Sequence, residues 1–263
     1  MATITHEGSH FNLAANRVVN FLGATVCSGY AILQSFCAYL KSHLAHHLFL
    51  GSADRDPDFK FQKEDGTYDE TSRLRFALKY LLAPLFLVKT PRKIVDLVRY
   101  RLLARPTNGR EWWDQIGSLG FFSTGISLFV WSGYGWEFLL FWIVPLLTTF
   151  PIVNYYNELL EHFPYAGESN VDILMSRNRW TDPVTRFFTG MFNEHMHQTH
   201  HLFPHCPFWA LPKIHLILME DPVYAATQHR DVGLFLPVIG GIPTILSNIL
   251  ASVAKRSKRA SSE

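Results

Sequence analysis

The chain has few charged residues for its length. Lys, Arg, Asp and Glu make up 17% of its 263 residues, against about 25% in a typical soluble domain. Hydrophobic residues make up 48% and aromatic residues 14%, which excludes a disordered chain and a coiled coil. The net charge of only +2 argues against a nucleic-acid partner.

Cysteine is also scarce, whereas histidine is abundant. The three cysteines, Cys27, Cys37 and Cys206, are too few and too scattered for a disulfide framework or a thiolate zinc site. In contrast, 13 residues are histidine, and five of them lie between His195 and His205. We therefore expect any metal site in this chain to use imidazole ligands.

Two apolar segments, 116–136 and 137–156, follow one another directly. Each has about 20 residues, which as a helix spans roughly 30 Å, the thickness of a bilayer core. They meet at the sequence Ser-Gly-Tyr-Gly-Trp, which is typical of a turn. The pattern predicts a transmembrane helical hairpin over 116–156; the alternative is a buried hairpin in a soluble protein.

Basic residues flank this pair on both sides but are absent from its turn. Seven bases lie between Lys89 and Arg110, and Arg177, Arg179 and Arg186 follow the second segment. The positive-inside rule places both flanks on the cytoplasmic side of the membrane.

Three further segments are ambiguous by hydropathy. Residues 18–40 and 232–254 are apolar but diluted by polar residues, glycine or proline, and the latter runs into the basic stretch 255–259. Residues 73–89 alternate bases with apolar residues, a composition compatible with a helix lying along a membrane surface.

The histidines form four clusters with helical spacing. His6 and His10 are four residues apart, His162 stands alone, and two clusters share the spacing H-x-x-H-H: His43, His46 and His47, then His197, His200 and His201. Positions i, i+3 and i+4 share one face of a helix. Nine imidazoles exceed the four ligands of a zinc ion and suit two metals of higher coordination number, for which iron, copper, nickel and zinc are candidates.

The remaining histidines are interpreted differently. His195 lies two residues before His197, off the shared face, and we interpret it, with His205, as a neighbour of the ligands rather than a ligand. His215 and His229 are interpreted as structural or surface residues.

The order of these clusters resembles the membrane fatty acid desaturase superfamily. The similarity extends to Asn20 and Gly23 between the first two clusters, and to the run His-Leu-Phe-Pro-His-Cys-Pro at 201–207. The resemblance implies an all-α integral membrane protein, with a transmembrane helical hairpin and a cytoplasmic helical cap that carries the histidine boxes. It also implies an O2-dependent desaturase of fatty acyl chains, held as acyl-lipid, acyl-CoA or acyl-carrier; a hydroxylase or a carotenoid ketolase is the alternative within the superfamily.

The resemblance also implies a site. Two non-haem iron ions would be held by His6, His10, His43, His46, His47, His162, His197, His200 and His201. Residues expected to orient those ligands are Asp56, Glu158, Glu161 and Asn193. Glu158 stands where acyl-CoA desaturases carry an Asn. The implied partners are a lipid or fatty acyl substrate and an external electron donor of the ferredoxin, rubredoxin or cytochrome b5 type.

The expected organisation is a single domain over 1–263. The first two boxes occupy 6–47, the hairpin 116–156, the lone His and the last box 157–224, and an amphipathic or re-entrant tail 232–263. A single crossing by 18–40 would separate the first two boxes across the bilayer, so we expect that segment to lie in or on the membrane. Only five residues precede His6, so the family's usual N-terminal transmembrane hairpin is expected to be absent.

Two readings from other classes stay open at this point. The sequence His6-Glu7-Gly-Ser-His10 formally matches H-E-x-x-H, the motif of zinc metalloproteases, with Glu7 as general base. That reading leaves the two H-x-x-H-H clusters unexplained. The other reading is an inactive, truncated homologue.

Overall fold

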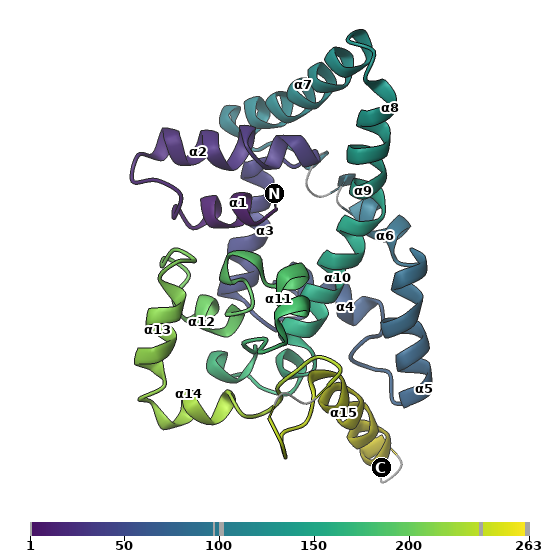
Figure 1. Ribbon diagram of the computed structural model, residues 1–263, viewed down its shortest axis with the longest axis vertical. Helices are drawn as coiled ribbons and strands as arrows, with labels where there is room; N and C mark the ends of the chain where they lie inside the picture. The colour runs from purple at the N-terminus through teal and green to yellow at the C-terminus, as the bar shows by residue number, and fades with distance from the viewer. Residues whose placement is uncertain (1, 97, 100–102, 237–238, 261–263) are drawn as a thin grey trace. The chain divides into compact units, whose positions relative to one another are not determined.

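A computed structural model of the chain describes residues 2–96, 98–99, 103–236 and 239–260. Within these ranges the secondary structure is entirely helical, and no strand is present, which confirms the all-α class. The chain divides into two compact units: Met1–Leu44 with Leu87–Asn154, and Ala45–Phe86 with Tyr155–Glu263. Two helices, α3 and α10, run from one unit into the other (Figure 1).

The first unit is built from the N-terminal helices and an apolar helical hairpin. Its elements are α1 (Ala2–Ser9), α2 (Arg17–Val26), the 3₁₀ turn η1 (Gly29–Ile32), most of α3 (Phe36–Leu48), α6 (Thr90–Asp96), α7 (Gly109–Trp131), α8 (Gly135–Phe138), the π-helical η5 (Leu139–Ile143), α9 (Val144–Leu147) and the start of α10 (Thr149–His162).

Helices α1 and α2 pack closely because small residues meet between them. A Cβ on Gly8 would collide with the Cβ of Ala24, and the amide of Asn20 donates to the Gly8 carbonyl oxygen over 2.8 Å. The hydroxyl of Thr5 lies 3.0 Å from the Ala24 carbonyl oxygen, to which it donates. These contacts hold the helix that carries His6 against the one that follows it.

The apolar segment 18–40 is not one straight helix. The helical run Arg17–Ile32 and helix Phe36–Leu48 are bent by 97° at the break between them, where Leu33 adopts a left-handed conformation with φ of 53°. The bend is anchored by Asp114 of α7, which is 3% exposed. Its carboxylate accepts hydrogen bonds from the Tyr30 hydroxyl (2.8 Å), the Ser35 hydroxyl (2.7 Å) and the backbone N–H of Cys37 (2.7 Å).

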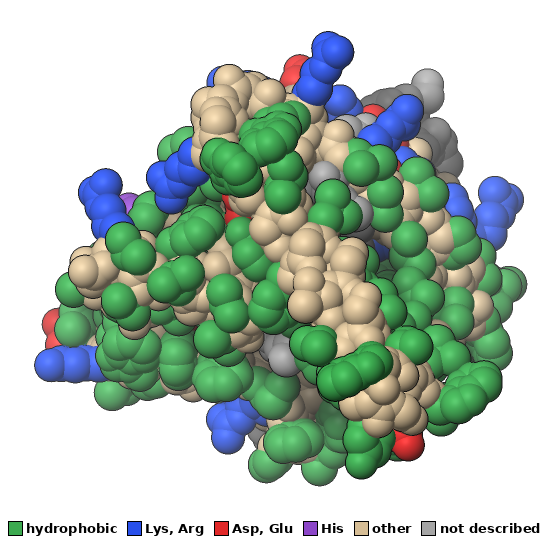
Figure 2. Space-filling model, turned by 90° about the horizontal axis from the view of Figure 1, so that it is seen from above, with side chains coloured by type: hydrophobic (Ala, Val, Ile, Leu, Met, Phe, Trp, Pro, Cys, Tyr) green, Lys and Arg blue, Asp and Glu red, His purple; other side chains and the backbone are tan. Residues whose placement is uncertain are grey.

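The expected hairpin is present as a pair of helical runs joined by a short turn. Helix α7 ends at Trp131, Gly133 turns the chain with φ of 83°, and α8, η5, α9 and α10 continue as one helical run, Gly135–His162. In Figure 2, which looks onto the end where α7 meets α8, apolar side chains cover most of the face.

The second helical run of this hairpin is the better candidate for a membrane span. Among the described residues, Gly135–His162 is the one continuous helix that is long and apolar enough to cross a bilayer. Its most apolar stretch has a mean hydropathy of 1.7, and only 6% of that stretch is buried. The bent pair Arg17–Ile32 and Phe36–Leu48 would qualify only if taken together as one broken span. Helix α7 does not qualify by itself, so a hairpin that crosses twice stays a prediction.

The second unit contains the remaining helices. They are the end of α3, α4 (Pro57–Glu64), α5 (Arg73–Phe76), the π-helical η2 (Ala77–Leu82), η3 (Ala83–Phe86), the rest of α10, η6 (Tyr165–Gly167), η7 (Asp172–Leu174), α11 (Pro183–Thr189), η8 (Met191–Asn193), α12 (His197–Leu202), α13 (Leu211–Leu218), α14 (Pro222–Thr227) and α15 (Ile245–Ala260).

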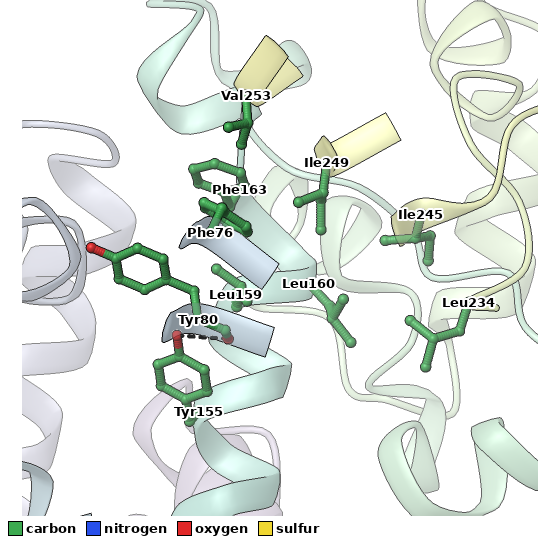
Figure 3. Close-up of a cluster of buried hydrophobic side chains, with 10 residues drawn as sticks. All are labelled: Phe76, Tyr80, Tyr155, Leu159, Leu160, Phe163, Leu234, Ile245, Ile249 and Val253. Atoms are coloured by element: carbon green, nitrogen blue, oxygen red, sulfur yellow. Dashed lines mark hydrogen bonds between the residues drawn. The ribbon is translucent and has the colours of Figure 1, made fainter. Parts of the chain in front are cut away.

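Its apolar core is shown in Figure 3. Helix α15 contributes Ile245, Ile249 and Val253, all fully buried at four-residue spacing, so one face of an otherwise basic helix closes the core. Side chains from α5, η2 and α10, together with Phe163 and Leu234 from outside the helices, complete the cluster. The C-terminal apolar segment therefore packs against its own unit through an amphipathic helix, preceded by a turn at Gly233 with φ of 81°.

Candidate metal centre

Four histidines of the second unit converge on one point. One ring nitrogen from each of His46, His162, His197 and His201 lies within 4.8 Å of the others. They come from the end of α3, the end of α10 and both turns of α12, where His197 and His201 share a face. The Nε2 of His197 lies 2.8 Å from Nε2 of His162 and 2.9 Å from Nε2 of His201.

Asp56 orients the first of these ligands. Its Oδ1 lies 3.0 Å from Nδ1 of His46, and its carboxyl group is fully buried. A carboxylate can only accept, so Nδ1 of His46 carries the proton, and Nε2 of the neutral ring carries the lone pair that a metal needs. Burial opposes a charge on His46, but Asp56 outweighs it and raises the pKa of the imidazole to about 9.

The Asp56 carboxylate is itself held by the backbone. It accepts from the N–H groups of Gly51 (2.9 Å), Asp58 (3.0 Å) and Phe59 (3.2 Å), and so caps helix α4. With both oxygens engaged, it is positioned to orient the ring of His46.

His162 and His197 are oriented from the opposite side of the cluster. Nδ1 of His162 lies 3.4 Å from the Met175 carbonyl oxygen, which again leaves the lone pair on Nε2. Nδ1 of His197 lies 3.6 Å from Oε2 of Glu161. Burial raises the pKa of Glu161 to about 8, although the buried guanidinium of Arg179, 2.8 Å from its other oxygen, opposes that rise.

The chemistry of this cluster fits a metal cation. Burial, and then the neighbouring imidazoles, lower the pKa values of His197 and His201 well below the ordinary value, so both rings are neutral near pH 7. Three neutral rings that direct Nε2 atoms at one another repel unless a cation accepts their lone pairs. Their separation matches the roughly 3 Å between adjacent ligand nitrogens at metal–nitrogen distances of about 2.1 Å.

The other two predicted ligands in this unit also lie together. Nε2 of His47 is 3.3 Å from Nε2 of His200, and the ring of His47 stacks on that of His201 with centroids 4.2 Å apart. On α3 and on α12, one histidine of each consecutive pair (His46 and His201) belongs to the quartet. The other of each pair (His47 and His200) lies beside its counterpart on the other helix.

Helix α12 is held in place by a buried amide. The side-chain oxygen of Asn178 accepts from the backbone N–H of Thr199 (3.1 Å), and its amide nitrogen, with two N–H donors, lies within hydrogen-bond distance of the hydroxyls of Thr199 (3.0 Å) and Tyr224 (2.8 Å) and of Oε1 of Gln228 (3.0 Å). All of these groups are buried. This network fixes the short helix that carries the last histidine box.

The first unit brings together the three predicted ligands that it contains. Nε2 of His10 lies 2.8 Å from Nε2 of His43, and the ring of His6 lies 4.6 Å from that of His43 and 5.2 Å from that of His10. The ring of Tyr39 stacks on His43 at 5.2 Å. Glu7 is buried, with Oε1 at 3.5 Å from Nδ1 of His6, in the position of a carboxylate that orients that ring.

The remaining predicted residues have varied surroundings. The carboxylate of half-buried Glu158 contributes to the raised pKa of His46. The amide of Asn193 donates to the Phe208 carbonyl oxygen over 3.0 Å, a loop contact. His195 is buried, with Nδ1 at 3.3 Å from the Gly190 carbonyl oxygen, whereas His205 is exposed.

Several structurally important residues were not identified from the sequence. Arg177 and Arg179 were counted as flanking surface charges, but both are at most 2% exposed and paired with Asp231 (3.1 Å) and Glu161 (2.8 Å). Asn178 between them carries no sequence signal beyond its type. The partners are distant in sequence, so spacing gives no indication of them.

Comparisons with known proteins identify the family of the chain. The profile of the family described as "Fatty acid desaturase" matches residues 1–232. The chain is 31% identical over 254 residues to a dihydrorhizobitoxine desaturase from Bradyrhizobium elkanii, covering 95% of this chain and 72% of that protein. It is 24% identical over 216 residues to a beta-carotene 4-ketolase from Protosiphon botryoides, covering 79% of this chain and 46% of that one.

The chain therefore belongs to the fatty acid desaturase family. The resemblance inferred from the histidine clusters is confirmed. The names of the relatives point to an oxidoreductase of the desaturase type.

Proposed function

We propose that the protein is an O2-dependent desaturase of fatty acyl chains that holds two non-haem iron ions. The observation that carries the proposal is the quartet His46, His162, His197 and His201, whose ligand atoms lie within 4.8 Å of one another and of which the first two are buried and the other two partly buried. These four residues are assigned to one iron. The remaining five predicted ligands, His6, His10, His43, His47 and His200, are by elimination the candidates for the other iron.

Bound iron supplies the oxidising power for removing hydrogen from an unactivated C–H bond, which amino-acid side chains cannot do by themselves. The chain's own contribution is to orient the imidazoles and to keep His197 and His201 neutral. Asp56 holds the tautomer of His46 through a 3.0 Å hydrogen bond, and Glu161, paired with Arg179, faces Nδ1 of His197. Burial of His46 and His162 limits the access of water to that side of the cluster.

The proposal extends to location and partners. Helix Gly135–His162 is the candidate span, and with α7 it would form the hairpin that leaves the boxes on the cytoplasmic side. Electrons would come from a separate ferredoxin, rubredoxin or cytochrome b5-type protein. A lipid or fatty acyl chain is the proposed substrate, although one relative is named for dihydrorhizobitoxine, so that compound belongs in the test.

The first experiment measures metal and product in the same preparation. The full chain is purified from membranes, and iron and zinc are quantified by elemental analysis for the natural protein and for His201→Ala, with His229→Ala as a control outside the clusters. We expect about two irons per chain, fewer in His201→Ala, and no change in the control.

Product analysis separates the proposed reaction from its alternatives. Cells that express the chain with a donor are profiled for new double bonds in lipids, and for hydroxyl or keto products. A new alkene that depends on O2 and on His201 supports the desaturase. A keto product would favour the activity named for the second relative. One zinc per chain, with activity lost in Glu7→Gln, would favour a metalloprotease and contradict the proposal.

A further inference from the structure

Residues 73–86 form one helical run with two opposite faces. Phe76, Tyr80 and Pro84 are buried at four-residue spacing. Leu74, Leu78, Leu82 and Phe86 follow the same spacing, displaced by two residues, and are 46% to 72% exposed. The buried face is anchored in the core of the second unit by Phe76 and Tyr80.

The π-helical turn explains why both faces stay straight. In an α-helix, residues four apart are offset by about 40°, so a stripe with a period of four would wind around the helix. The wider turn of η2, Ala77–Leu82, offsets them in the opposite sense. The π turn therefore opposes the winding over Ala77–Leu82, and Leu74, Leu78 and Leu82 all remain exposed.

Two tyrosines place this run beside the candidate membrane span. The hydroxyl of Tyr155 donates to the Tyr80 carbonyl oxygen over 3.1 Å, shown in Figure 3, and that of Tyr156 donates to the Leu81 carbonyl oxygen over 2.5 Å. Both tyrosines belong to the helical run Gly135–His162, near its C-terminal end. Tyrosine is enriched where transmembrane helices meet the membrane–water interface, so the outer stripe of 73–86 lies at that depth.

The positive charge of this segment indicates what covers its exposed apolar stripe. Residues 73–95 contain six bases and no acidic residue, and Arg73, Arg75 and Lys79 are exposed. An apolar stripe beside bases is the pattern of helices that lie in the plane of an anionic bilayer.

We propose that residues 73–86 are an interfacial helix that inserts Leu74, Leu78, Leu82 and Phe86 into the headgroup boundary of an anionic membrane. The adjacent bases contact lipid phosphates. This inference rests on the proposed membrane span, because Tyr155 and Tyr156 define the depth of the helix. It adds a second membrane contact that is independent of the metal centre.

The test places a fluorescent probe at Leu78→Cys in the full chain, with Cys27→Ser and Cys206→Ser to remove other accessible thiols. The protein is reconstituted into phosphatidylcholine vesicles with or without phosphatidylglycerol, and quenching by doxyl-labelled lipid is measured. We expect quenching at Leu78 at least about twofold stronger than at Lys63→Cys, an exposed position on α4, and stronger still with phosphatidylglycerol. Arg75→Gln should reduce the gain from phosphatidylglycerol, whereas Lys63→Gln should not.

A third probe at Leu140→Cys, in the span and 54% exposed, separates the two proposals. Quenching at Leu140 without quenching at Leu78 overturns the interfacial helix and leaves the span intact. Lack of quenching at both positions overturns both proposals. Cross-linking between copies through Leu78→Cys, without lipid quenching, would assign the stripe to a dimer interface and also overturn the proposal.

Discussion

Single buried polar groups decide the geometry of this molecule. The carboxylate of Asp56 accepts from one imidazole and three backbone N–H groups, and therefore links the orientation of His46 to the start of helix α4. The neighbouring Asp58 lies 3.8 Å from the same Nδ1 but is partly exposed. Because Asp58 is close to Asp56 in sequence but lies farther from His46, it is a suitable control for substitutions of Asp56.

Replacing Asp56 by Asn should weaken metal binding by about tenfold, because the neutral amide keeps an acceptor but makes His46 a poorer ligand. Asp58→Asn should change affinity far less. Competition with a chelator of known affinity measures both values in purified protein. Equal effects of the two substitutions would mean that Asp56 does not orient the ligand.

The buried ion pair between Arg177 and Asp231 offers a second prediction at this scale. Arg177→Met would leave Asp231, which also accepts from the hydroxyl of Tyr165, without its cation in a buried site. We expect a loss of about 3–5 kcal/mol in the free energy of unfolding.

The double variant Arg177→Met/Asp231→Leu removes both charges and should recover part of the loss. Thermal unfolding in detergent, followed by circular dichroism, compares the two variants. If the double variant loses as much stability as the two single substitutions would lose together, Arg177 and Asp231 do not stabilise the fold as a pair.

These residues also show why sequence patterns predict only part of the site. The spacing of His43, His46 and His47 is local, so helical geometry alone predicts that they share a face. Arg177 and Arg179 lie in a polar run that resembles a solvated flank. Their burial depends on Asp231 and Glu161, which tertiary structure alone brings near.

At the scale of elements, the position of a helix is set by what caps it. Helix α3 carries the second histidine box, and its N-terminus is held by Asp114 of α7 through Ser35 and the N–H of Cys37. The same carboxylate holds Tyr30. The 97° bend before α3 thus depends on one side chain from a helix that is distant in sequence.

Asp114→Ala should destabilise the first unit by about 3 kcal/mol, because it leaves buried donors without an acceptor. Ser118→Ala, one turn further along α7, removes a fully buried hydroxyl that has no hydrogen-bond partner among the described residues, and should be neutral or slightly stabilising. Thermal unfolding of both variants tests the difference. A loss in Ser118→Ala as large as in Asp114→Ala would point to general sensitivity of α7 rather than to a cap.

The element scale also separates what hydropathy can predict from what it cannot. The turn between 116–136 and 137–156 is present at Gly133, because glycine and the end of an apolar run are local signals. The conformation of 18–40 and 232–254 depends on tertiary contacts. Asp114 fixes the bend in the first segment, and Ile245, Ile249 and Val253 hold the second in the core of its unit. Neither the contact with Asp114 nor the packing of that core can be predicted from composition.

At the scale of the whole molecule, membrane orientation remains the property that the fold alone does not assign. The bases before α7 and the exposed apolar surface of Gly135–His162 both favour a turn on the far side of the bilayer from the histidine boxes. Burial of Arg177 and Arg179 in ion pairs removes two of the charges on which that orientation was first argued. The remaining support comes from the bases between Lys89 and Arg110 and from exposed Arg186.

The orientation can be measured with thiol probes in intact cells. In a background of Cys27→Ser and Cys206→Ser, Ser132→Cys in the turn should react with a membrane-impermeant maleimide from outside. Glu64→Cys on α4, which is also exposed, should react only after permeabilisation. Reaction of both positions from the same side would contradict a double crossing by α7 and the helical run Gly135–His162. Because His46 and His197 lie in one cluster, neither helical run would then cross the bilayer, and the hairpin would lie along the membrane on the side of the histidine boxes.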